Sequence, residues 1–126
     1  MVPSLCQSAS QIFEMTDQIV ILSTCGSEQE ATKLAQLLLE RRLAACVNVA
    51  PRILSFYRWK GKIESNYEWL LIVKTSRELF GSVSQALEAA HSYEVPEVIA
   101  IPIVDGSANY LDWLRSSILP EAGSES

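Results

Sequence analysis

The stretch Ile53–Thr75, ILSFYRWKGKIESNYEWLLIVKT, decides the fold. Two runs rich in β-branched and aromatic residues flank Lys60-Gly61, and a glycine-containing dipeptide between such runs is typical of a tight turn. The pattern predicts a hairpin whose first strand begins with an extended segment from Leu43 and bends at Pro51. Both strands exceed the usual strand length of about 5–6 residues. We therefore expect part of the hairpin to project beyond its own domain.

The segment before the hairpin predicts a strand and a helix. The continuous apolar run Ile19–Leu22 is typical of a strand covered on both faces. Ser27 and Glu30 match a capping box, in which the serine caps the Glu30 amide and the glutamate reaches back. Apolar residues then recur at helical spacing, at Ala31, Leu34, Ala35 and Leu38.

The segment after the hairpin predicts a helix, a strand and a last short helix. Thr75–Glu78 matches a second capping box, and the helix that it opens ends near His91. Glu97–Val104 is expected to form a strand at a sheet edge or bulge, because Pro102 cannot donate to a ladder. Gly106-Ser107 opens the last helix. The order β-α-β-β-α-β-α indicates an α+β protein, a ferredoxin-like β-α-β-β-α-β sandwich with an extra C-terminal helix.

The chain length of 126 residues corresponds to a single domain. We expect the folded unit to span residues 18–119. Residues 1–17 lack sustained periodicity and residues 120–126 are polar, so both are predicted to be flexible tails.

The composition narrows the classes of partner. A net charge of −5 argues against a nucleic-acid or anionic-membrane binder, since phosphates require Lys and Arg. Apolar residues nevertheless make up 48% of the chain, which suggests that another subunit covers part of the surface. Cys6, Cys25 and Cys46 form neither a disulfide framework nor a zinc motif, so we expect a reducing, cytoplasmic setting.

The sequence contains few motifs that indicate catalysis, metal binding or RNA binding. His91 is the single histidine, and no local signature supports a nucleophile paired with it. Cys25, Cys46 and His91 are the soft or imidazole ligands of the folded unit and could in principle hold Cu(I), although a small buried hydrophobe is the favoured interpretation of Cys46. The basic and aromatic stretch Arg52–Lys62 invites an RNA-binding interpretation, but a packed hairpin with solvated cations is favoured.

Five segments, in order along the chain, together identify a family resemblance. They are Glu40–Asn48 (ERRLAACVN), Tyr57–Gly61 (YRWKG), Glu68–Thr75 (EWLLIVKT), His91–Ile99 (HSYEVPEVI) and Tyr110–Leu114 (YLDWL). These segments resemble the CutA family, the divalent-cation tolerance proteins, and the resemblance covers about Ile19–Ile118.

The resemblance implies a ferredoxin-like protomer in a tight homotrimer, with long hairpins that extend each sheet into a neighbour. It also implies a likeness to PII-type signalling trimers, a cytoplasmic setting and a link to copper and other divalent cations. No established catalytic reaction comes with it, so we expect a protein that is not an enzyme. The favoured hypothesis is a trimeric binding protein for a small molecule or a metal. The alternatives are a copper-binding protein that uses Cys46 and His91, and a structural or partner-binding trimer.

The family motifs also imply a ligand cleft between protomers. Its lining, carried over by position, would be Cys46, Tyr57, Trp59, Glu68, Lys74, His91, Tyr93 and Glu97. Lys74 and His91 would suit a small anionic metabolite, and Trp59 would offer a stacking face. Tyr110 and Trp113 are expected to pack the last helix. Ser23, Ala90 and Ser92 depart from the family pattern, so Cys46 and His91 alone would need a neighbouring subunit to complete a copper site.

Overall fold

The computed structural model describes residues 16–120. The predicted tails fall almost wholly outside that range, so their flexibility stays a prediction. Within it, Thr16 is buried beside the sheet, and the backbone carbonyl of Asp17 accepts a hydrogen bond from the Arg77 amide.

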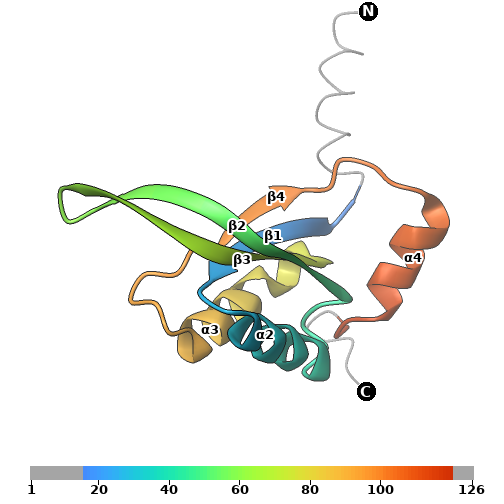
Figure 1. Ribbon diagram of the computed structural model, residues 1–126. Coiled ribbons are helices and arrows are strands. Elements are labelled where there is room, and N and C mark those ends of the chain that lie inside the picture. The colour runs from blue at the N-terminus through green and yellow to red at the C-terminus, as the bar shows by residue number, and fades with distance from the viewer. Residues whose placement is uncertain (1–15, 121–126) are drawn as a thin grey trace, which may run out of the picture.

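Within residues 16–120, four strands and three α-helices build the α+β fold that the sequence predicts (Figure 1). In chain order the elements are β1 (Gln18–Cys25), α2 (Glu28–Glu40), β2 (Cys46–Trp59), β3 (Lys62–Ser76), a short 3₁₀ helix (Arg77–Leu79), α3 (Phe80–Ala90), β4 (Ile99–Pro102) and α4 (Ala108–Ser116). The sheet has the order β2-β3-β1-β4, and every pair of neighbours is antiparallel. This is the ferredoxin-like topology, with α4 as the extra helix.

The core lies between one face of the sheet and the helices α2 and α3, which cover that face (Figure 1). Alternate residues of the two central strands point into it, because successive side chains of a strand face opposite sides. Those residues are fully or almost fully buried and include Ile19, Ile21, Leu71 and Val73. The helices contribute Leu34, Leu38, Val83 and Leu87.

The hairpin β2–β3 forms as predicted and projects from the body of the molecule (Figure 1). Its turn has φ of 51° at Lys60 and 82° at Gly61, the backbone of a tight hairpin turn. The bend at Pro51 is a register shift between Ala50 and Ile53, with Arg52 in the left-handed region at φ 56°. Such a bulge bends and twists the strand that contains it.

The first strand of the hairpin starts at Cys46 rather than near Leu43. The reason is the end of α2: the Leu43 amide donates to the Leu38 carbonyl at 2.9 Å, and Arg42 takes the left-handed conformation with φ 58°. This pattern closes a helix C-terminus and uses the residues that would otherwise begin the strand.

One of the two predicted capping boxes forms in part and the other does not form. The Ser27 hydroxyl accepts a hydrogen bond from the Glu30 amide at 3.1 Å, while the Glu30 carboxylate turns to Ser92 instead of reaching back. The second prediction is wrong. Thr75 lies in β3, fully buried, and its hydroxyl donates to the Leu43 carbonyl at 2.6 Å.

At the C-terminal end, β4 is an edge strand that closes on Pro102, shorter than the predicted range. Helix α4 is capped by Ser107 and anchored by the buried Leu114. Tyr110 and Trp113 are 41% and 45% exposed, and their rings lie at a tilt to each other with centroids 5.4 Å apart. Among the described helices, none is long and apolar enough to cross a membrane.

Candidate functional site

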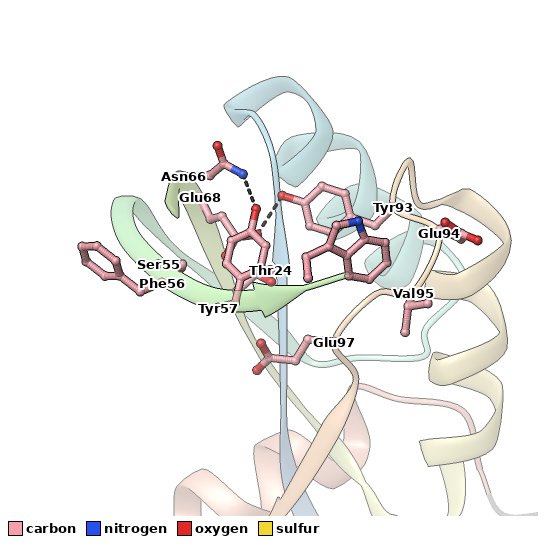
Figure 2. Close-up of a pocket in the computed structure, with 11 residues that line it drawn as sticks. Thr24, Ser55, Phe56, Tyr57, Asn66, Glu68, Tyr93, Glu94, Val95 and Glu97 are labelled. Carbon is pink, nitrogen blue, oxygen red and sulfur yellow. Dashed lines mark hydrogen bonds between the residues drawn. The ribbon is translucent and has the colours of Figure 1, made fainter. Parts of the chain in front are cut away.

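A pocket of about 560 Å³ lies between the hairpin and the loop that joins α3 to β4 (Figure 2). The loop and the hairpin strands form opposite walls, and the end of β1 contributes Thr24. The lining residues are Thr24, Ser55, Phe56, Tyr57, Trp59, Asn66, Glu68, Tyr93, Glu94, Val95 and Glu97. A volume of this size suits a metabolite-sized ligand.

Five of the eight residues expected in the cleft line this pocket: Tyr57, Trp59, Glu68, Tyr93 and Glu97. His91 lies behind the wall, with its ring 4.7 Å from that of Tyr93 between centroids. Cys46 and Lys74 pair with each other across β2 and β3 at the other end of the hairpin. The Lys74 ammonium lies 5.8 Å from the centroid of the Tyr110 ring. Within this chain, therefore, neither of the groups expected to bind an anion lines the pocket.

Glu68 and Tyr93 form the most buried polar contact of the pocket. The Tyr93 hydroxyl donates to the Glu68 carboxylate at 2.7 Å, and only 8% of Glu68 is exposed. Burial and the adjacent Glu68 carboxylate raise the pKa of Tyr93, so the phenol keeps its proton and serves as a donor. Figure 2 shows Tyr57, Glu68 and Tyr93 converging, while Phe56 points away from them.

His91 fixes the loop rather than facing the pocket. Its side chain is 0% exposed, and Nε2 lies 2.7 Å from the Thr24 carbonyl, which can only accept. Nδ1 accepts from the Tyr93 amide at 3.0 Å. Both ring nitrogens are thus engaged by backbone groups, and the pattern defines a neutral imidazole with its proton on Nε2.

Glu30 holds the same loop from helix α2. Its carboxylate accepts from the Ser92 amide at 2.8 Å and from the Ser92 hydroxyl at 2.9 Å, and one oxygen lies 3.6 Å from Nδ1 of His91. Burial alone would raise the pKa of this carboxyl, but the two Ser92 hydrogen bonds hold it below the ordinary value of 4.5.

The two predicted copper ligands do not meet in one chain. Cys46 stands opposite Lys74, and Lys74 pairs with Val20, whereas His91 binds Thr24, four residues further along β1. Four residues of a strand span about 13 Å. Burial raises the pKa of the Cys25 thiol to about 11, which keeps it protonated and a poor ligand. Across residues 16–120, no group of three or more His, Cys, Asp or Glu side chains could hold a metal ion.

Sequence reasoning missed Thr24, Ser55, Phe56, Asn66, Glu94 and Val95. Two of these residues could have been found from sequence patterns. Phe56 lies in the basic and aromatic stretch, and Glu94 flanks Pro96 together with Glu97. Asn66 has no such signal. Its amide donates to the Tyr57 hydroxyl, a contact that depends on the register of the hairpin.

Fold and pocket together define a ferredoxin-like protein with a pocket lined by aromatic and acidic side chains at the base of a long hairpin. The model of the CutA1 divalent ion tolerance protein family matches residues 19–117. The chain belongs to this family.

Relatives and solved structures agree with that assignment. The divalent-cation tolerance protein CutA of Thermus thermophilus is 46% identical over 98 residues, which are 78% of this chain and 95% of the relative. Human protein CutA is 46% identical over 92 residues, 73% of this chain, and the match spans about half (51%) of the human protein. The structure of the Thermus protein has a TM-score of 0.79 at 44% identity, covering 80% of this chain and 98% of that one. The crystal structure of CutA1 from Oryza sativa has a TM-score of 0.81 at 40% identity, covering 82% and 95%.

Proposed function

We propose that this protein is a non-enzymatic binding protein within the divalent-cation tolerance family, and that its pocket takes a small molecule. The observation that supports this most is the preformed pocket of about 560 Å³ with the Glu68 carboxylate buried at its wall. Pockets that combine aromatic side chains with a few fixed polar groups are typical of ligand sites.

A binding role rather than catalysis fits the state of the candidate reactive groups. His91 is buried, and backbone groups engage both of its ring nitrogens, so it is not placed to act as a general base. The thiol of Cys25 is buried and protonated. The family description names tolerance to divalent ions and no reaction.

We further propose that the protein acts as a homotrimer in the cytoplasm. The sheet face turned away from α2 and α3 is apolar: Leu22 pairs with Ile72 on one side and Ile99 on the other, and Val20 pairs with Ile101. Ile99 and Ile101 are 51% and 47% exposed in the single chain. Covering such a face is a common reason for subunit association. The thiols of Cys25 and Cys46, which form no disulfide, suit a reducing compartment.

Copper binding through Cys46 and His91 is the alternative proposal. The fit within one chain is poor, because the two residues lie at different ends of the sheet and His91 offers no nitrogen without breaking a backbone hydrogen bond. A copper site would therefore need a second chain and a rearranged loop. A purely structural or partner-binding trimer is a further alternative.

The test is a thermal-shift screen of metabolites and metal salts against three proteins: the wild type, Trp59→Ala and Trp113→Ala. Both tryptophans are partly exposed, but only Trp59 lines the pocket, so Trp113→Ala is the matched control. A ligand that binds the native state raises the melting temperature, by an amount that grows with its concentration. We expect at least one stabilising compound whose effect survives in Trp113→Ala and is lost in Trp59→Ala. A broad screen without any stabilising compound would count against the proposed function.

A further inference from the structure

All the charged side chains that line the pocket are acidic. The lining includes three carboxylates, from Glu68, Glu94 and Glu97, and no lysine or arginine. Throughout residues 16–120 the only ion pair between charged side chains joins Arg115 and Asp112, and the Glu30 carboxylate lies near the neutral His91 ring, so none of the three carboxylates is paired. A wall of this kind concentrates cations and repels anions.

Glu68 is the carboxylate for which this matters most. It is more than nine-tenths buried, and the contact that the described residues give it is the Tyr93 hydroxyl, a neutral donor on one of its two oxygens. A buried carboxylate is stabilised by a nearby positive charge, and here this chain does not supply one. A bound cation would compensate the charge.

The aromatic side chains of the pocket favour the same kind of ligand. Tyr57 and Trp59 stand on β2 with partly exposed rings, and the Asn66 amide holds the Tyr57 hydroxyl in place. Aromatic faces attract cations through the ring quadrupole, most strongly for tryptophan. The Trp59 ring already has a cation near it, since the Lys60 ammonium lies 5.7 Å from its centroid.

We propose that the pocket binds a small organic cation, an alkylated or quaternary ammonium compound, with its charge beside Glu68 and its carbon groups on the rings of Tyr57 and Trp59. This inference rests on the proposed function and names the chemical class of its ligand. It differs from the anionic metabolite expected from the sequence for a cleft between protomers, since Lys74 and His91 of this chain do not line the pocket.

An organic cation fits better than a bare metal ion. A divalent metal needs several oxygen, nitrogen or sulfur ligands around one point. No group of three such acidic, histidine or cysteine side chains occurs in the described part of the chain, and one oxygen of Glu68 is occupied by Tyr93. Aromatic rings offer a metal no comparable ligands, whereas they pack well against methyl groups.

The experiment is a titration calorimetry series with choline and with its neutral isostere, in which a tert-butyl group replaces the trimethylammonium group. The two probes have nearly the same shape, so their difference reports the charge. We expect choline to bind the wild type about 5- to 20-fold more tightly than the isostere. Glu68→Gln and Glu97→Gln should each reduce this preference by about 3-fold or more, whereas Glu40→Gln, an exposed acid at the end of α2 outside the pocket, should leave it unchanged.

Each alternative outcome has a definite meaning. Equal affinity for the two probes overturns the cation proposal and leaves a small-molecule pocket standing. Tighter binding of citrate than of choline, or Glu68-dependent binding of a divalent metal without choline binding, overturns it in favour of an anion or metal site. If the thermal-shift screen yields stabilising compounds but none is cationic, only the cation proposal fails. If the screen yields no stabilising compound, both the cation proposal and the proposed binding function fail. Glu97→Gln alters an exposed side chain and keeps the test valid where Glu68→Gln does not fold.

Discussion

Glu30 and His91 are the two residues that tie the pocket loop to the body of the protein. Glu30 reaches from α2 to both the amide and the hydroxyl of Ser92, and His91 spans from the Thr24 carbonyl to the Tyr93 amide. Because these contacts fix the loop, the Tyr93 hydroxyl is held against the Glu68 carboxylate in the pocket wall. Both residues act on the pocket through the loop rather than by touching a ligand.

Glu30→Gln should lower the free energy of unfolding by about 1–3 kcal/mol at neutral pH, since it weakens charge-assisted hydrogen bonds to Ser92. The pKa of Glu30 is lower in the folded state than its ordinary value of 4.5. The stabilisation is therefore present above that value and is lost as the pH falls through the folded pKa. Urea unfolding at a series of pH values measures both effects. Glu28→Gln, an exposed acid in the same helical turn, is the control and should change little.

The His91 imidazole should carry its proton on Nε2 rather than Nδ1, as its two backbone partners require. Long-range nitrogen–proton correlation spectra distinguish this tautomer from the alternative. Because His91 is the single histidine of the chain, the assignment is unambiguous. A proton on Nδ1 would contradict the hydrogen-bond pattern described here.

At the scale of elements, the hairpin depends on its turn. Gly61 has φ of 82°, where an L side chain is strained whatever the space around it, so Gly61→Ala should cost about 1–2 kcal/mol of unfolding free energy. Gly81 lies in α3 with nothing within 4 Å of an added Cβ, so Gly81→Ala should be neutral or stabilise by up to about 1 kcal/mol. Denaturant unfolding of the two variants compares them directly. Equal effects would show that backbone strain at the turn is not what distinguishes them.

Sequence patterns predicted the element types because their causes are local. The apolar run of β1, the β-branched and aromatic residues of β2 and β3 and the Lys60-Gly61 turn are each recognisable within a few residues. The errors came from tertiary contacts. Thr75 matched a helix cap, but its hydroxyl is used by the Leu43 carbonyl, 32 residues away in the sequence.

The candidate site residues also divide into those that local motifs located and those whose position depends on tertiary structure. Family motifs located the five pocket residues that lie on the hairpin and the loop, whereas Lys74 and Cys46 share those motifs but stand at the other end of the strands. Strand register, which no single motif encodes, decides which side of the sheet and which end each residue reaches. The role of His91 as a loop anchor is visible only in the structure, since its partner Thr24 is 67 residues distant in the sequence.

At the scale of the whole molecule, the apolar sheet face should be an interface between copies of this chain. Ile101→Glu places a charge in the middle of that face, so it should dissociate the proposed trimer, and sedimentation velocity would report the loss. Leu39→Glu changes a similarly exposed apolar residue on α2, on the other side of the sheet, and should leave the assembly intact. A wild-type protein that sediments as a monomer would refute the trimer.

Native mass spectrometry of the protein, purified without steps that strip ligands, examines assembly and binding together. We predict a species of three times the 14.0 kDa chain mass, carrying up to three copies of a small adduct that is positively charged in tandem spectra. The adduct should be retained in Trp113→Ala and lost in Trp59→Ala. A bare chain mass, or a trimer whose adduct is acidic or persists in Trp59→Ala, would contradict a cation-binding pocket at the base of the hairpin.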